Sequence, residues 1–187
     1  MDDRLITRML KRTDMDARDQ LVQSAMREFE ARLVRYACSI LNDLDRARDV
    51  VQETFIKLYQ QDPEQVNRAL KSWLFTVCRN RCFDVMRKEN RLVLVPDEMI
   101  ASTRRTDEDP SRELQREEAK GEVLRFLERL PENQREVIRL KFQHDMSYKE
   151  ISEVTNLSVS NVGFLIHTGL KRLRVMMDHH QSSELMP

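Results

Sequence analysis

One face of a predicted helix over residues 158–177 carries polar and aromatic side chains suited to contact with DNA. At 100° per residue, the side chains expected on the buried face are Val159, Val162, Ile166, Gly169, Leu170 and Leu173. Hydroxyl and amide groups hydrogen-bond base edges, Phe and Leu contact thymine methyl groups, and Lys and Arg bind phosphates. The predicted DNA-contacting residues are therefore Ser158, Ser160, Asn161, Phe164, Leu165, Thr168, Lys171 and Arg172.

The segment before this helix predicts a helix-turn-helix. Ser147 and Glu150 match a capping box that starts a short helix over residues 147–155, and a three-residue turn leads to the next helix. This spacing favours DNA reading over the alternative, an ordinary surface face with one exposed Phe. No Asp, Glu, Lys or Arg occurs from Val154 to Leu170. Because phosphate contacts supply much of protein–DNA affinity, we expect this module to bind DNA weakly on its own.

An acidic group in the first half of the chain has the spacing of a partner-binding helix face. Asp49 and Glu53 are four residues apart, with Gln52 between them. Like charges at this spacing cost a few tenths of a kcal/mol in a helix, which suits a partner with basic groups. The alternative is a solvated acidic face.

A basic stretch follows at residues 79–88. Arg79, Arg87 and Lys88 can meet phosphates, and the amide of Asn80 can read the edge of an unpaired base. Four nearby aromatic residues are candidates for base stacking, namely Tyr59, Trp73, Phe75 and Phe83. For Trp73, core packing is the favoured alternative.

The three cysteines, Cys38, Cys78 and Cys82, predict small buried thiols in a reducing compartment, the cytoplasm. A metal site needs more ligands than these, and the sequence contains no P-loop or metal motif, so no metal or other cofactor is expected. Cys82 and Asp84 are close in sequence but have no nearby His. An enzyme is accordingly the least favoured function.

Composition indicates helices. The 187 residues include only 3 Gly and 5 Pro, and 6% are aromatic, which disfavours the turns and strands of a β protein. No uncharged apolar run approaches the ~20 residues that span a bilayer, and the N-terminus does not resemble a secretory signal. The zero net charge argues against a free-standing nucleic-acid binder. It hides, however, a net +3 in residues 1–88, −4 in residues 89–119 and +1 in residues 120–187.

Apolar spacing predicts an all-α protein of two small helical domains joined by an acidic linker. Helices are expected over about 21–41, 45–59, 70–86, 110–129, 131–144, 147–155 and 158–177, with breaks at Asn42-Asp43 and Gln61-Asp62-Pro63. Pro110 suits the first position of the helix that follows Asp109. The predicted organisation is an N-terminal extension over 1–15, a three-helix domain over 16–90, a linker over 91–109, a helix-turn-helix domain over 110–177 and a tail over 178–187.

These motifs, in this order, resemble regions two and four of bacterial RNA polymerase sigma factors of the extracytoplasmic function group. The segments that carry the resemblance are DVVQETFIKLY at residues 49–59, WLFTVCRNRCFDVMRK at residues 73–88, LERLPENQREVI at residues 127–138 and the helix-turn-helix. The chain departs from the family pattern at Arg48, where an acidic residue is usual. It departs again at Gly163, Leu165 and Thr168, where the family often has Arg.

The resemblance implies a transcription initiation factor, not an enzyme, that recognises promoters and melts DNA. Core RNA polymerase is the implied partner, through the clamp of its largest subunit and the flap of its second-largest subunit. Promoter DNA and an anti-sigma factor are the other implied partners. No insertion into a membrane is expected. The implied polymerase-binding residues are Asp49, Gln52, Glu53 and Phe55. Those implied for the −10 element are Arg79, Asn80, Asp84, Arg87 and Lys88, and the helix-turn-helix residues above are implied for the −35 element.

Two further alternatives remain open at this stage. An autonomous helix-turn-helix regulator would bind duplex DNA tightly without polymerase. A sigma-like interaction protein would use its uncharged helix to bind a protein partner and would open no promoter.

Overall fold

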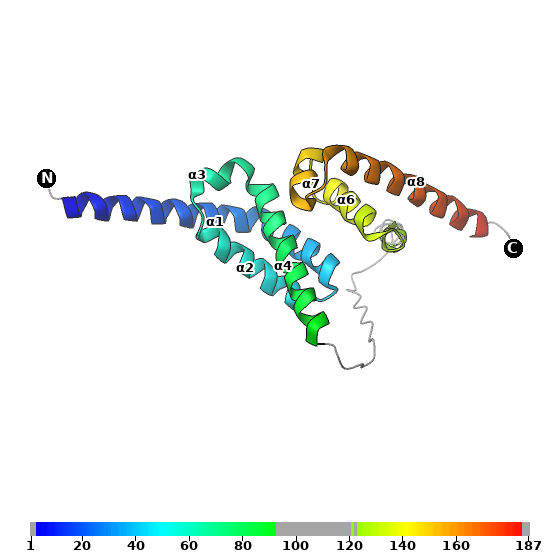
Figure 1. Ribbon diagram of the computed structural model, residues 1–187, viewed down its shortest axis with the longest axis horizontal. Helices are drawn as coiled ribbons and strands as arrows, with labels where there is room; N and C mark the ends of the chain where they lie inside the picture. The colour runs from blue at the N-terminus through cyan, green and yellow to red at the C-terminus, as the bar shows by residue number, and fades with distance from the viewer. Residues whose placement is uncertain (1–2, 93–120, 122, 185–187) are drawn as a thin grey trace, which may run out of the picture. The chain divides into compact units, whose positions relative to one another are not determined.

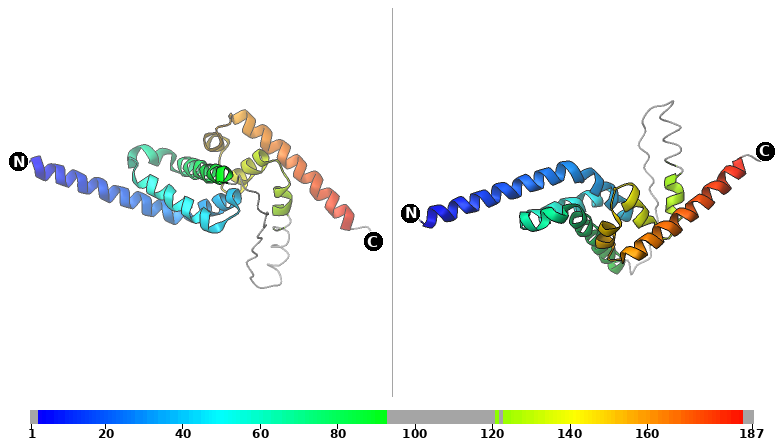
Figure 2. Two further views of the ribbon diagram at one scale, coloured as in Figure 1. Left: turned by 60° about the horizontal axis from the view of Figure 1, so that its bottom comes forward. Right: turned by 90° about the horizontal axis from the view of Figure 1, so that it is seen from above.

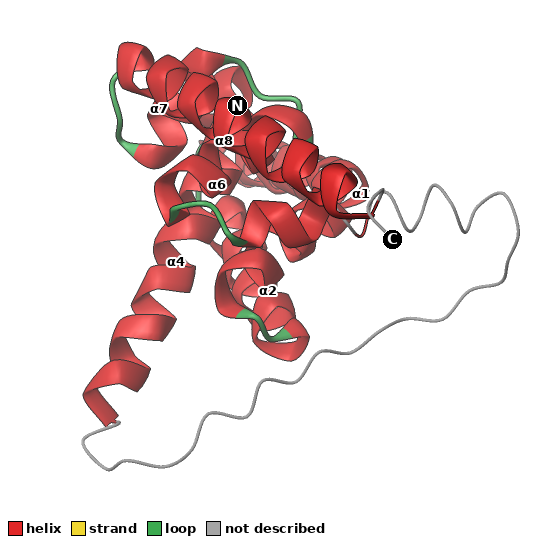
Figure 3. Ribbon diagram, turned by 90° about the vertical axis from the view of Figure 1, so that its right-hand side faces the viewer, coloured by secondary structure: helices red, strands yellow, loops and turns green. Residues whose placement is uncertain are grey.

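The computed structural model describes residues 3–92, 121 and 123–184 (Figure 1). Within these ranges all regular structure is helical, as predicted (Figure 3). The chain divides into two compact units, Met1–Pro96 and Asp97–Pro187, which are described separately. None of the helices in the described ranges combines the length and the apolarity needed to cross a membrane.

The first unit is a bundle of three long helices, α1 (Asp3–Leu41), α2 (Leu44–Tyr59) and α4 (Leu70–Leu92), each packed on the other two. Short elements α3 (Pro63–Val66) and η1 (Asn67–Ala69) connect α2 to α4 (Figure 2). Its buried core comprises Ala25, Phe29, Leu33, Tyr36, Ala37, Ala47, Val50, Val51, Phe55, Leu58, Leu74, Phe75, Cys78 and Cys82. The predicted three-helix bundle is confirmed.

The predicted break between α1 and α2 is confirmed, and two side chains explain it. Asn42 adopts a left-handed backbone conformation (φ 52°), which Asn tolerates better than most residues. Asp43 then caps α2, its side chain accepting a hydrogen bond of 3.0 Å from the backbone amide of Arg46.

At three other places the first unit differs from the prediction. Pro63 begins a short helix instead of lying in a loop, because Asp62 caps that helix and a first helical position needs no backbone N–H. Helix α1 starts at Asp3, so residue 16 is not an element boundary. Helix α4 runs to Leu92, past the predicted linker start at residue 91. The rest of that linker and the predicted helix start at Asp109-Pro110 lie outside the described residues.

The cysteines only partly follow their prediction. Cys78 and Cys82 are buried, but Cys38 is half-buried, because it lies one position past Ala37 at the border of the buried face of α1. A hydrogen bond with Cys82, and after it burial, raise the pKa of the Cys78 thiol well above its usual value.

The second unit is a helix-turn-helix supported by further helices. Residues 123–128 are helical and are followed by α6 (Glu132–Phe142), α7 (Tyr148–Thr155) and α8 (Val159–Glu184). The capping box at Ser147 and Glu150 is formed in full, and Asn156 ends α7 in the left-handed region at φ 58°. The Ser158 side chain accepts a hydrogen bond of 3.2 Å from the Asn161 amide and so caps α8. The predicted helix-turn-helix is confirmed.

Helix α8 packs closely on α6 at Gly169. A Cβ atom there would lie 2.6 Å from Cδ1 of Ile138 and 3.3 Å from Cβ of Gln134, so a side chain at this position would require both of these side chains to shift. The buried stripe of α8 comprises Val162, Ile166, Gly169 and Leu173.

The predicted buried face of α8 was too wide. Val159 and Leu170 are 48% and 41% exposed. Val159 lies in the first turn, at the edge of the packed stripe, and Leu170 is one position past Gly169, turned away from α6. The predicted end at Met177 was also wrong, because α8 continues to Glu184. Met176 and Met177 explain part of this length, since both pack against the buried cluster of Phe126, Leu127, Leu130, Ile138 and Leu173.

Candidate nucleic-acid and protein interfaces

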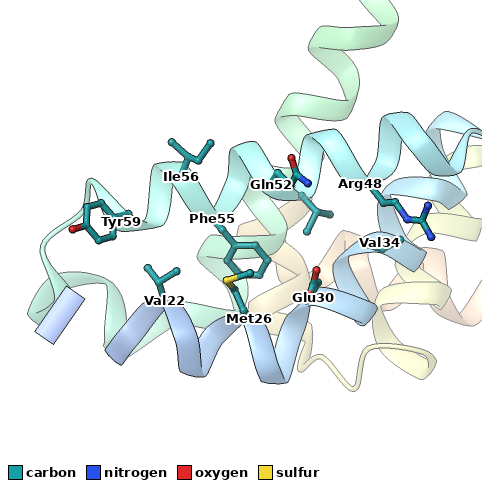
Figure 4. Close-up of a pocket in the computed structure, with 10 residues that line it drawn as sticks. Val22, Met26, Glu30, Val34, Arg48, Gln52, Phe55, Ile56 and Tyr59 are labelled. Carbon is teal, nitrogen blue, oxygen red and sulfur yellow. The ribbon is translucent and has the colours of Figure 1, made fainter. Parts of the chain in front are cut away.

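A groove of about 520 Å³ lies between α1 and α2 (Figure 4). Its walls are mostly apolar, and the lining residues are Val22, Met26, Glu30, Val34, Arg48, Val51, Gln52, Phe55, Ile56 and Tyr59. Phe55 and Met26 point toward one another across the groove (Figure 4). Phe55 is only 5% exposed, whereas Ile56 is 59% exposed. The groove therefore has a packed floor and an accessible apolar rim, which suits a partner helix.

Of the four residues predicted to bind a partner on α2, two line this groove and two do not. Gln52 and Phe55 belong to it. Asp49 is exposed on α2 outside the groove lining. Ile56 and Tyr59, which do line the groove, were missed, because an apolar residue outside the main helical stripe gives no sequence signal that separates a rim from a surface.

Glu53 is held within the chain by Arg81 of α4. The Arg81 Nη2 atom donates a hydrogen bond of 2.8 Å to Glu53 Oε1, and Nε makes a second close contact with the carboxylate. The hydrogen bond and charge of Arg81 lower the pKa of Glu53, while the same pair raises the pKa of Arg81. Glu53 therefore already has a basic partner in α4, whereas in the described ranges no such partner accounts for the prediction at Asp49, and binding of either residue to polymerase stays a prediction. Arg46 and Glu89 form a second ion pair between α2 and α4.

This ion pair predicts a pH dependence of the first unit. A carboxyl with a lowered folded-state pKa stabilises the fold above its ordinary pKa of 4.5 and loses that contribution as the pH falls through the lower folded value. Because the pair is partly exposed, we expect a loss of no more than about 1 kcal/mol between pH 6 and pH 3. Urea unfolding at a series of pH values, followed by the fluorescence of Trp73, measures this loss. Glu53→Gln should make the free energy of unfolding depend less on pH between pH 6 and pH 3. An unchanged pH dependence would contradict the stabilising role of the Glu53–Arg81 pair.

The five residues predicted for the −10 element all lie on α4 and differ in accessibility. Asn80, Arg87 and Lys88 are exposed. Asp84 forms an ion pair of 2.9 Å with Arg87, and the Arg79 guanidinium lies 4.7 Å from the centre of the Phe83 ring. Asn80, Asp84, Arg87 and Lys88 share one helix face at spacings of four, three and one.

The predicted stacking residues do not all remain available. Phe75 is fully buried and lies 5.2 Å, centre to centre, from the Tyr36 ring, so this candidate was wrong. The sequence pattern failed here because Phe75 falls beside Leu74, where α4 packs against both other helices. Trp73 is half-buried, Phe83 is half-buried beneath Arg79, and Tyr59 is 40% exposed on the rim of the groove.

The reading face of α8 is accessible at its centre. Phe164 is 64% exposed, and Ser160, Asn161 and Lys171 are exposed too. Leu165 and Thr168 are half-buried. These side chains emerge from a helix fixed by the cap at its start and by α6 and α7 behind it, which is how a recognition helix is held toward a major groove.

Gln134 of α6, which is 7% exposed, connects to two residues of this face. Its Nε2 donates a hydrogen bond of 3.3 Å to Thr168 Oγ1, and its Oε1 accepts a hydrogen bond of 3.1 Å from Arg172 Nη1. Gln134 therefore orients α8 side chains, a role that no periodicity in the sequence indicates. In the described ranges, no group of three His, Cys, Asp or Glu side chains is arranged to hold a metal ion.

Comparison with known proteins matches both units to family models. Residues 25–92 match Sigma-70 region 2, and residues 120–173 match Sigma-70, region 4. The chain is 28% identical over 167 residues to the ECF RNA polymerase sigma factor SigM of Bacillus subtilis, covering 89% of this chain and 98% of SigM. It is 31% identical over 135 residues to the ECF RNA polymerase sigma factor RpoE of Cereibacter sphaeroides, covering 70% of each. The sigma factor RpoE of Bartonella quintana, solved in complex with the anti-sigma factor NepR, superposes with a TM-score of 0.61 at 25% identity, covering 85% of this chain and 97% of that one.

Proposed function

Because this chain belongs to the ECF group of bacterial RNA polymerase sigma factors, we infer that it binds core RNA polymerase and directs promoter recognition and transcription initiation. The observation that carries the inference is the joint presence of both sigma regions, in order, in one chain. It is a transcription initiation factor and not a classical enzyme. The free energy for opening the DNA then comes from binding unpaired bases. The proposed place of action is the cytoplasm.

The α1–α2 groove is the proposed contact with the clamp of the largest polymerase subunit. Its apolar rim at Ile56 and Tyr59 offers burial to a partner helix, and exposed Asp49 offers charge to basic groups beside it. Phe55 supports this surface from beneath. Glu53 contributes by tying α2 to α4 through Arg81. The second unit is proposed to contact the flap of the second-largest subunit.

The exposed face of α4 is the proposed reader of the melted −10 strand. Arg87 and Lys88 supply charge for phosphates, and the Asn80 amide supplies donors and an acceptor for a base edge. Asp84 orients Arg87 through their ion pair. Arg79, stacked on Phe83, presents a cation beside the same strand.

The reading face of α8 is the proposed contact with the −35 element. Ser160, Asn161, Phe164 and Leu165 face base edges, while Lys171 and Arg172 face phosphates. Ser158 acts as the cap that places the first turn. An anti-sigma factor is the proposed regulator, by analogy with the RpoE–NepR complex.

Mapping of transcript starts tests the function. The purified chain, core polymerase and genomic DNA fragments from the source bacterium should yield discrete starts above those of core polymerase alone. Asp49→Lys should reduce their yield by at least about tenfold, because it reverses a charge at the proposed docking surface. The matched change Glu28→Lys, at an exposed acidic residue of α1 outside the groove lining, should not. An absence of new starts with the unmodified chain would overturn the proposed function.

A further inference from the structure

The centre of the α8 reading face is an exposed aromatic ring, with no Asp, Glu, Lys or Arg side chain beside it. Phe164 is 64% exposed, the largest exposure among the large hydrophobic side chains of the described residues. From Val154 to Leu170 the chain has no Asp, Glu, Lys or Arg, and the exposed His167 is the one titratable side chain within a turn of Phe164. An aromatic ring held in water at this place loses nothing when it meets an apolar group of a ligand.

The positions around Phe164 have little hydrogen-bonding capacity left for bases. The Thr168 hydroxyl donates a hydrogen bond of 2.8 Å to the Phe164 carbonyl and accepts a hydrogen bond from Gln134 Nε2. Its one proton and one of its lone pairs are therefore engaged. Gly163 has no side chain, and the Tyr148 ring lies 3.5 Å from the place a Cβ would occupy. Polar contacts with bases are left to Ser160 and Asn161, one turn before Phe164, and to the exposed His167, one turn after it.

A methyl group is the feature of duplex DNA that such a face detects. In the major groove, thymine is the base whose edge carries a methyl group, at C5. Polar Ser160 and Asn161 on one side, and exposed Lys171 and Arg174 two turns further on, give this helix the arrangement of base contacts followed by phosphate contacts. A patch that binds a protein would not need Lys171 and Arg174 on the same side of the helix as the polar residues.

We propose that Phe164 is a specificity-determining residue that recognises the C5 methyl group of a thymine in the −35 element. The proposal rests on the assignment of α8 to that element. It explains how a recognition helix with no Arg among the side chains proposed to face base edges still discriminates sequence, because one buried methyl group changes an affinity by about fourfold.

A paired library experiment tests this. Duplex promoter libraries with a randomised −35 region are prepared once with thymidine and once with deoxyuridine, which differ only in the C5 methyl group. The full chain bound to core polymerase selects from each. We expect a preference of about fourfold for thymine at one position, and we expect the deoxyuridine library to lose it.

Three variants make the test specific. Phe164→Ala should abolish the thymine preference, and Phe164→Leu should keep part of it. Phe142→Ala, which removes a ring of α6 that is 57% exposed, should leave the preference intact. A thymine preference that survives in deoxyuridine, or in Phe164→Ala, would overturn the proposal while leaving −35 reading in place. Loss of anti-sigma binding in Phe164→Ala with an unchanged base preference would also overturn it, and would assign the ring to a protein. Selection without any −35 preference would instead remove the assignment on which the proposal rests.

Discussion

Core RNA polymerase should raise the affinity of this chain for promoter DNA by at least about 100-fold. The α8 reading face carries no charge at its centre, so the second unit releases few counterions and binds duplex DNA weakly alone. The first unit is proposed to read a strand that is unpaired only in the open complex. When one polymerase holds both units, each meets its DNA element at a high effective concentration, and avidity gains of 10²–10⁴ are typical.

Fluorescence anisotropy with a labelled promoter duplex, with and without core polymerase at one fixed salt concentration, measures this gain. The Asp49→Lys chain is the control, because its polymerase binding is expected to fail while α8 stays unchanged. Promoter binding by the free chain as tight as that of the holoenzyme would contradict the prediction and favour an autonomous regulator.

Phe55→Ala should destabilise the first unit by about 3–5 kcal/mol, whereas Ile56→Ala should change its stability by less than about 0.5 kcal/mol. The two residues are adjacent in the groove, but Phe55 is 5% exposed and Ile56 is 59% exposed. Truncating Phe55 leaves a cavity under the α1–α2 contact. Truncating Ile56 removes only rim surface, so its effect should fall on polymerase affinity instead.

The single Trp of the chain, Trp73, lies in α4 of the first unit and reports that unit's unfolding without interference from the second. Urea titrations of the full chain therefore give the free energy of unfolding for each variant, and a polymerase pull-down gives docking. If Ile56→Ala lowered stability as much as Phe55→Ala, or left polymerase binding unchanged, the groove would not be the docking surface.

Local signals in the sequence were enough for the helix order, because turn chemistry and caps are local. Asn42, Asp43, Ser147 and Ser158 act within three residues of themselves, so their effects can be read along the chain. The Gly-poor and Pro-poor composition likewise fixed an all-helical class.

What the sequence did not reveal depends on contacts between helices. Glu53 looked like a free surface acid until α4 brought Arg81 to it, 28 positions along the chain. Phe75 looked available for stacking until two other helices covered it. Leu170 looked buried by periodicity, but α6 approaches at Gly169 and leaves its neighbour outside. The spacing of apolar residues predicts which face of a helix is buried, but it does not predict how much of that face the neighbouring helix covers.

The thiols of Cys78 and Cys82 lie inside the same helix that is proposed to meet the melted strand. Cysteine reacts with peroxides and electrophiles as the thiolate, and the Cys78 thiol is both buried and held protonated by a raised pKa. Oxidants in the cell would therefore reach the half-buried Cys38 before this pair. The two thiols of this helix are thus protected from oxidation for as long as the bundle stays folded.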